Sequence, residues 1–376
     1  LQQKINNLDE LNKKMPKISD AYRQYGRIKS DKITIYLSDE LIELTEKNNE
    51  DNLVVSNIKL RQDITDKYAY VIPNIRYSDD AELEPFQYRI DIREVPAATG
   101  LVYPSYRMLC KGQSNLTRKP SNAISGIDPI YFLDVFWLKE EDTKDFWEKG
   151  LSASQVISQH LGQLCIKHAQ DLLDYKDVNK FMEIVRKENF DLAENVVPEI
   201  VAMGDLRYIL ASLVRERVPI KDITFIFEKI MDLYSFAVDK EILLEKLRIA
   251  LKRQISYSIC DSNSVINSIT IEPDLEKYIK DNLIESENSA SIINFSDEET
   301  ELLMTNTAKI IENAKVRIEN SAIITTPSIR QSLFSFYEEF IPGLTILAYE
   351  EVSNEINLEE IGTLSKKVIY KSKKKK

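Results

Sequence analysis

The sequence has 376 residues, of which 43% are hydrophobic and 30% charged, a composition typical of a folded chain with several domains. Its formal net charge of −11 argues against nucleic acid, and against an anionic membrane surface, as the main partner. The phosphate-binding signatures G-x-x-x-x-G-K-[ST] and G-x-G-x-x-G are both missing from the glycine-poor sequence. Three widely spaced cysteines indicate reduced thiols rather than a disulfide framework.

The two ends of the sequence differ from the rest. Residues 1–27 are polar and broken by Pro16, as in a linker, and the basic tail 371–376 is expected to be solvated. No apolar run reaches the length of about 18 residues that a membrane span needs, so no transmembrane helix is predicted here. The sequence begins with Leu1 rather than Met, which leaves open that a membrane part precedes it.

The first folded segment is expected to combine strands and helices. A strand is predicted over 32–37 and a helix over 53–64, where apolar residues recur at helical spacing. The stretches "AYVIPNIRY" and "FQYRIDIREV" read as a pair of strands, because polar and apolar residues alternate in the second of them. Residues 96–150 are rich in proline and hold short apolar runs, which is typical of a small strand-containing insertion.

Helical periodicity dominates the middle of the chain. A single amphipathic helix is expected over 152–173, and a compact helical region over 176–254. The last third alternates between strands and helices. Strands are predicted over 268–272, 322–326 and 344–349, and helices over 273–284, 296–318 and 327–340. The strand–helix–strand order implies a parallel βαβ unit with a right-handed crossover. Thr326 is the expected N-cap of its helix, with Pro327 at the first helical position.

These elements predict an α+β chain of four subdomains. The first is mixed α/β and is interrupted by the strand-containing second, the third is all-α, and the fourth is α/β with the βαβ unit. The predicted boundaries are 28–98 plus 150–175, 99–149, 176–256 and 257–370.

The sequence offers little catalytic chemistry. His160 and His168 lie eight residues apart on one predicted helix, about 12 Å along its axis, which is too far to share one zinc ion. Packing and capping are therefore their expected roles. The stretch "GLSAS" resembles a nucleophile elbow only weakly, because Ser154 replaces the second glycine, and a helix N-cap is the preferred interpretation. We predict no catalytic residue, metal site or cofactor, and hence a binding or scaffold protein rather than an enzyme.

The charged stretch "LVRERVPIKDI" has a structural interpretation. Arg215 and Arg217 fall in the last turn of one predicted helix, where positive charge favours the negative end of the helix dipole. Pro219 is expected to begin the next helix, with Asp222 in its first turn. The sequence therefore predicts a helix–turn–helix corner.

Several stretches, in order from Asp31 to Ile361, resemble the export-gate family of type III secretion systems and flagella, the FHIPEP family. "DPIYFLDVFWL" resembles the family pattern D/E-P-x-F-G-L-x-A-x-W-I, and "VISQHLGQLCIKHAQDLL" resembles V-x-x-T-H-L…A-x-E-L-L. "IRYSDDAELEPFQYRIDI" is similar to a strand–loop–strand signature that ends in L-x-P-x-x-Y-R-I. "VPEIVAMGDLRYILASLVRERVPIKD" and "TTPSIRQSLFSFYEEFIPGLTILAYEEV" resemble the pattern around V-P-I-R-D and the closing βαβ unit.

The resemblance implies the cytoplasmic domain of an inner-membrane protein whose transmembrane half is absent. Family members form a nine-fold cytoplasmic ring below the export channel, with four subdomains in each subunit. The implied partners are secretion chaperone–substrate complexes, a gatekeeper protein and the ATPase stalk protein. The implied function includes setting the order in which substrates are exported. Nucleic acid is not an expected partner.

In flagellar relatives the chaperone docks in a cleft between the first two subdomains. The motifs place Asp128 on the family's acidic position and Tyr131 on its aromatic position, and Gln159 stands where threonine is usual. Cys110 aligns with an apolar position of the cleft. Asp128 could instead cap a turn before Pro129, and Tyr131 could be part of the core. The departures at Tyr131 and Gln159 favour an injectisome member over a flagellar one.

The resemblance also gives the corner a second interpretation, in which Arg215, Glu216 and Arg217 face a neighbouring subunit or the channel of the ring. One alternative function stays open. Open parallel sheets bind ligands beyond their strand ends, so the C-terminal βαβ unit could belong to a soluble enzyme or a protein that binds small anions.

Overall fold

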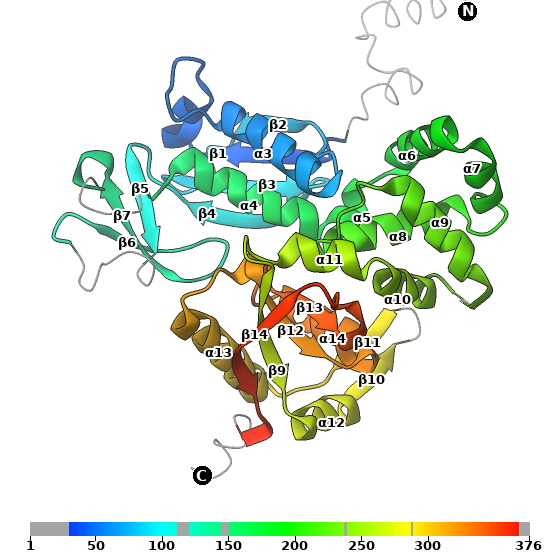
Figure 1. The fold of residues 1–376 in the computed structure, drawn as a ribbon. Coiled ribbons are helices and arrows are strands. Elements are labelled where there is room, and N and C mark those ends of the chain that lie inside the picture. The colour runs from blue at the N-terminus through cyan, green and yellow to red at the C-terminus, as the bar shows by residue number, and fades with distance from the viewer. Residues whose placement is uncertain (1–29, 111–119, 144–149, 237–238, 287–288, 368–376) are drawn as a thin grey trace, which may run out of the picture.

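The computed structural model describes residues 30–110, 120–143, 150–236, 239–286 and 289–367. The predicted linker 1–27 and basic tail 371–376 lie outside these residues. The described elements form three four-stranded sheets, a two-stranded hairpin and a helical body (Figure 1). The chain is therefore α+β with several separate sheets, as predicted from its sequence.

The first sheet has the strand order β2-β1-β3-β4. Its strands are β1 (Ile33–Leu37), β2 (Ile75–Asp79), β3 (Gln87–Ile92) and β4 (Val95–Leu101). The predicted pairing of β2 with β3 is wrong, because β1 lies between them, parallel to β2 and antiparallel to β3. The apolar β1, whose Ile33 and Ile35 are fully buried, takes the central position.

Two helices, α3 (Leu53–Tyr68) and α4 (Ala153–Lys167), pack against each other over this sheet (Figure 1). Small residues allow the close approach. The Ser56 and Ser154 hydroxyl oxygens lie 3.0 Å apart, and a Cβ on Gly162 would come within 2.8 Å of a Leu60 methyl group. Apolar burial and hydroxyl pairing thus share one helix–helix interface.

The helix α4 begins where the sequence predicts. Ser152 is its N-cap and forms a capping box with Gln155. The prediction of one continuous helix over 152–173 is wrong, because α4 ends at Lys167 and a short helix α5 (Ala169–Leu172) follows. Side chains from the first sheet region bind carbonyls of this turn: Lys32 Nζ donates to Leu172 O at 2.9 Å and Arg93 Nε to Asp171 O at 2.6 Å. These tertiary contacts therefore hold the end of α5.

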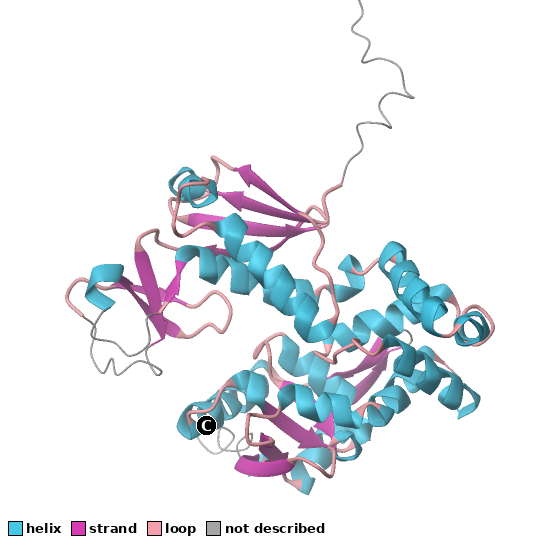
Figure 2. Cartoon of the chain, turned by 45° about the horizontal axis from the view of Figure 1, so that its top comes forward, coloured by secondary structure: helices cyan, strands magenta, loops and turns pink. Residues whose placement is uncertain are grey.

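The second sheet stands at one end of the molecule, beside the first (Figure 2). Its strand order is β6-β7-β5-β8, and all described pairings are antiparallel. The strands are β5 (Tyr106–Cys110), β6 (Ile124–Ile127), β7 (Asp134–Lys139) and β8 (Leu151–Ser152). Trp137 of β7 is buried and lies edge-on to Tyr103, which anchors this sheet to the rest of the chain.

The helical body lies at the opposite end (Figure 1). Its helices are α6 (Tyr175–Glu188), α7 (Phe190–Val196), α8 (Met203–Arg215), α9 (Ile223–Leu233), α10 (Lys240–Ala250) and α11 (Lys252–Ile259). The expected start of α9 at Pro219 is wrong, because Asp222 is its N-cap. The link between α8 and α9 stays extended since Ile220 N–H donates to Tyr68 O at 3.0 Å, which ties the body to α3.

The third sheet is parallel throughout, with the order β13-β12-β9-β14. Its elements are β9 (Val265–Ile271), α12 (Pro273–Asp281), α13 (Asp297–Ala314), β12 (Ser321–Thr325), α14 (Pro327–Glu338), β13 (Thr345–Ala348) and β14 (Asn357–Leu364). The predicted parallel unit β12–α14–β13 is present, and Pro327 occupies the first turn of α14. The hairpin β10 (Leu283–Ser286) and β11 (Ser289–Ile293), and the strand β14, are elements that the sequence analysis missed.

One apolar core runs from the first sheet through the helical body, and a second fills the space between the third sheet and its helices. Within the described residues, no helix is long and apolar enough to cross a membrane. The four subdomain boundaries given above stay a prediction.

Candidate functional site

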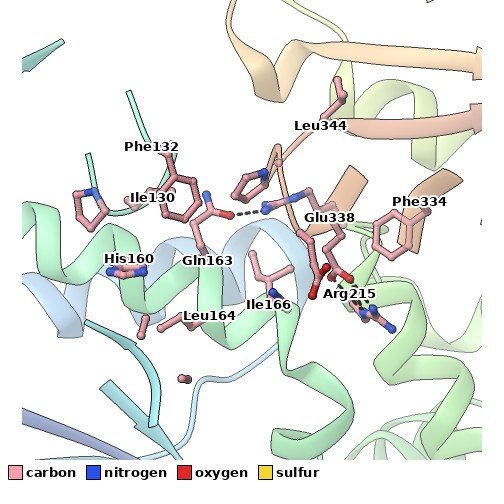
Figure 3. A pocket seen from close by; sticks show the side chains of 18 of the residues that line it. Ile130, Phe132, His160, Gln163, Leu164, Ile166, Arg215, Phe334, Glu338 and Leu344 are labelled. Atoms are coloured by element: carbon pink, nitrogen blue, oxygen red, sulfur yellow. Dashed lines mark hydrogen bonds and ion pairs between the residues drawn. The ribbon is translucent and has the colours of Figure 1, made fainter. Parts of the chain in front are cut away.

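A pocket of about 330 Å³ opens where the first sheet, the second sheet, the helical body and the C-terminal part meet (Figure 3). Its lining residues come from all four: Ala97, Ala98, Thr99, Pro129, Ile130, Phe132, His160, Gln163, Leu164, Ile166, Lys167, Arg215, Arg217, Phe334, Glu338, Glu339, Pro342, Gly343 and Leu344. Because such junctions are common ligand sites, we take this pocket as the candidate functional site.

The loop between β6 and β7 forms one wall of the pocket. Asp128 is buried at its start, and its carboxylate accepts the N–H groups of Ile130 at 2.8 Å and Tyr131 at 3.4 Å. Burial raises the pKa of Asp128 above its ordinary value, although these two N–H groups oppose the shift. Asp128 therefore caps the turn before Pro129, which is the alternative role that its sequence position allowed.

Tyr131 reaches away from its own sheet. Its hydroxyl donates to Glu319 Oε1 at 2.8 Å, in the C-terminal part of the chain. Burial, with a contribution from the Glu319 carboxylate, raises the pKa of Tyr131 well above its ordinary value. The predicted docking tyrosine thus bridges the second sheet and the C-terminal part in this structure.

None of the four predicted docking residues lines the pocket. Gln159 is exposed on α4, and Gln163, one turn later, lines the pocket instead. Cys110 is half-buried at the end of β5, in register with Val135. Asp128 and Tyr131 thus share the loop whose Pro129, Ile130 and Phe132 line the pocket, and their docking role stays a prediction.

The histidine on the pocket floor is a packing residue. His160 is buried on α4, and its Nδ1 lies 2.8 Å from the Tyr88 hydroxyl oxygen. Burial lowers the pKa of His160 to about 4, so the ring is neutral near pH 7. Among the described residues, no group of three or more His, Cys, Asp or Glu side chains could hold a metal ion.

The charged corner after α8 forms the opposite wall. Arg215 donates from Nε to both carboxylate oxygens of Glu338, at 3.0 and 3.1 Å, and its Nη2 donates to the same group. Arg217 Nη2 donates to Gln163 Oε1 (Figure 3). The predicted interface residues therefore make contacts within the chain, and their role between subunits stays a prediction.

Glu216, the third residue of the corner, belongs to a buried ionic network. Its Oε2 lies 2.6 Å from Arg330 Nη1 and 2.8 Å from Arg248 Nη1. Arg248 also pairs with Glu351 at 2.6 Å, and Arg330 Nε donates to Glu245 at 2.8 Å. Burial would raise the pKa of Glu216, but the two guanidinium groups lower it below its ordinary value. The network joins the helical body to the C-terminal part.

Sequence reasoning missed four contributors to this region: Phe132, Gln163, Glu319 and Arg330. Only Phe132 carried a sequence signal, because it occupies the glycine position of the family pattern D/E-P-x-F-G-L. The other three gain their roles from partners that are distant in the chain, which periodicity and local motifs do not indicate.

Comparison with known proteins agrees with the ordered motifs. The FHIPEP family model matches residues 2–357. The flagellar biosynthesis protein FlhA of Bacillus subtilis is 24% identical over 331 residues, which are 86% of this chain and 48% of that protein. The chain thus spans about half the length of the curated relatives that it matches.

Solved structures show the same fold. The Chlamydia pneumoniae CdsV protein, solved in complex with CdsO, aligns with a TM-score of 0.70 and 21% identity, over 89% of this chain and 97% of that chain. The nonameric EscV cytosolic domain from the type III secretion system aligns with a TM-score of 0.65 and 19% identity, over 89% and 96% of the two chains. The resemblance predicted from the sequence is confirmed, and the chain belongs to the FHIPEP family.

Proposed function

We propose that this chain is the cytoplasmic, ring-forming domain of the export gate of a type III secretion system, on the inner face of the bacterial inner membrane. The match of the FHIPEP family model to residues 2–357 carries this proposal. The fold shared with the nonameric EscV cytosolic domain supports ring formation, and the fold shared with CdsV, solved with CdsO, supports partner docking. The proposed role is binding rather than catalysis.

We further propose that the pocket and the 128–133 loop form the docking site for chaperone–substrate complexes. A gatekeeper and the ATPase stalk protein are proposed as further partners of the ring. The aromatic position is kept at Tyr131 while its polar surroundings differ from the flagellar pattern, so we favour an injectisome system. An aromatic side chain near a carboxylate is a common arrangement at protein interfaces.

Ring formation can be tested directly by sedimentation velocity and negative-stain microscopy at increasing protein concentration. We expect concentration-dependent self-association that Arg217→Glu weakens, whereas Lys315→Glu, an equal charge change elsewhere, leaves it intact. Monomers under every condition, even with the cognate stalk protein added, would contradict the ring.

Docking can be tested by calorimetry with chaperone–substrate complexes from the same genome. Tyr131→Ala is expected to weaken binding by about tenfold or more, as for an interface hot spot. Asp128→Asn removes the negative charge but keeps a side-chain oxygen that can cap the turn. It therefore tests whether binding needs the charge of Asp128 or only the loop conformation. Unchanged affinity in both variants, with folding intact, would remove these residues from the docking site.

The alternative function, a small-anion site at the βαβ unit, receives no support from the local geometry. At the start of α14, Glu276 Oε1 accepts the Thr326 N–H at 3.1 Å and the Thr325 hydroxyl at 2.9 Å. A carboxylate of the chain thus occupies the place where a bound anion would accept these hydrogen bonds. We expect no thermal stabilisation by nucleotides or phosphorylated metabolites, and a clear shift would revive this alternative.

A further inference from the structure

Phe132 combines two unfavourable features for a residue of a folded chain. Its backbone has a φ of +55°, in the left-handed region that bulky side chains rarely adopt. Its ring is 66% exposed, at the rim of the pocket. The family pattern has glycine here, which adopts this conformation without strain. The strained, exposed ring contributes little to the stability of the isolated chain, so its presence calls for another explanation.

Arg217 repeats the backbone feature on the opposite side of the pocket. It follows α8 with a φ of +61°, and Val218 N–H donates to Leu213 O at 2.8 Å, as in a Schellman helix end. Glycine is usual at this position, yet the chain carries a guanidinium group there. Gly343, with a φ of +94°, lines the same pocket. Left-handed backbone from three distant segments meets here, and such conformations gather at ligand-binding sites.

The chemistry of the pocket indicates what it would accept. Its floor and sides are largely apolar, and Ile127 and Leu133 extend an exposed apolar ridge beside Phe132. Three cationic and two acidic side chains line it, although the chain as a whole has a net charge of −11. Glu338 is paired with Arg215, whereas the Arg217 guanidinium donates to the neutral amide oxygen of Gln163 and has no ion pair with a carboxylate in the described part of the chain. The pocket therefore offers apolar surface together with a positive charge that is bonded to a neutral amide rather than paired with a carboxylate.

We propose that Phe132 and Arg217 together bind an apolar segment of a partner protein that carries an acidic side chain. The partner side chains pack against the Phe132 ring and enter the pocket, while the partner carboxylate pairs with Arg217. An Arg–carboxylate contact at the edge of an apolar pocket is a strong, directional interaction. This inference rests on the proposed docking function and names its recognition chemistry.

The experiment measures fluorescence anisotropy of labelled, blocked dodecapeptides built from leucine and glutamate, with matched leucine/glutamine and leucine/lysine peptides. Phe132→Asn and Arg217→Asn are the test variants, because asparagine tolerates left-handed backbone while removing the ring or the charge. Two control variants change residues outside the pocket. Lys315→Asn removes a charge from the residue after α13, whose backbone is also left-handed, and Phe190→Asn removes a ring that is 63% exposed. Phe132→Gly is a second ring-less variant in case Phe132→Asn does not fold.

We expect the leucine/glutamate peptide to bind the unmodified chain about tenfold more tightly than the leucine/lysine peptide, a difference of about 1.4 kcal/mol. Phe132→Asn should weaken binding of the glutamate and glutamine peptides alike by about tenfold. Arg217→Asn should reduce the affinity for the glutamate peptide to that for the glutamine peptide. Both control variants should bind as the unmodified chain does.

Equal binding of the glutamate and lysine peptides, or unchanged binding by Phe132→Asn and Phe132→Gly, would overturn the inference. The cognate chaperone–substrate complex separates this failure from that of the proposed function. If the complex binds the unmodified chain and Phe132→Asn equally, docking stands and the recognition chemistry falls. If the peptides behave as expected but no chaperone complex binds, the proposed docking function fails instead.

Discussion

His160 shows how one buried side chain links the pocket floor to the stability of the chain. Its ring sits between the pocket and Tyr88, with 2.8 Å between Nδ1 and the phenol oxygen. Burial holds its folded-state pKa at about 4, below the ordinary value of 6.5. The unfolded chain therefore binds a proton between these pH values that the folded chain does not.

This difference predicts an acid-sensitive stability. The contribution of neutral His160 to the free energy of unfolding is fully present above pH 6.5. It is lost as the pH falls from 6.5 to 4, and the complete loss amounts to about 3 kcal/mol. Urea unfolding of the unmodified chain and of His160→Gln at several pH values measures this loss. The two chains share the same carboxylates, so the difference between their pH profiles reports His160 alone. Parallel pH profiles for the two chains would contradict the assignment.

Between elements, the buried ionic network sets how α14 sits against the helical body. Arg330 is fully buried and contacts carboxylates from the corner after α8, from α10 and from the turn after β13. Removing one partner of such a network leaves charge uncompensated in a low-dielectric interior. The network therefore favours the packing in which every one of its buried charges has a partner, because any other packing would leave a buried charge unpaired.

Arg330→Met is accordingly expected to lower the free energy of unfolding by about 3–5 kcal/mol. Arg253→Met is the matched control, because Arg253 pairs with Glu355 on the surface at 3.2 Å, and such pairs contribute about 0–1 kcal/mol. Denaturant unfolding of both variants gives the comparison. If the two variants lost similar amounts of unfolding free energy, the buried network would contribute no more to stability than a surface ion pair.

Elements with their own start signals were the most predictable from the sequence. Pro327 marks the start of α14, and the Ser152–Gln155 box marks the start of α4. Pairing was less predictable, since β1 inserts between β2 and β3 although these two strands follow each other in the chain. The strand β14 has a largely exposed, polar pattern and was missed for that reason.

The candidate site was predictable only in part. The motif placed Asp128 and Tyr131 on one loop, and the structure adds that Asp128 caps this loop. Tyr131 meets Glu319 although 188 residues separate them, and Arg215 meets Glu338 across 123 residues. No local pattern encodes such contacts, because they depend on how the sheets and the helical body pack.

Across the whole molecule, the Tyr131–Glu319 hydrogen bond couples the second sheet to the C-terminal part. A double-mutant cycle with Tyr131→Phe and Glu319→Gln is expected to give a coupling energy of about 1 kcal/mol in unfolding experiments. The equivalent cycle on Tyr257 and Glu355, an exposed pair at 3.1 Å, should give a smaller value. A zero coupling at Tyr131 would mean that the contact is not maintained in solution.

The position of β14 has a consequence for the order of folding during synthesis. It pairs with β9 along its whole length, from Val265↔Asn357 to Ile271↔Leu364, so the third sheet cannot close until this late segment has left the ribosome. Until then the apolar β9 presents an open edge, the kind of surface that promotes aggregation. Chains that stop before Asn357 are therefore expected to accumulate as insoluble protein or on chaperones, which pulse-labelling of truncated chains would reveal.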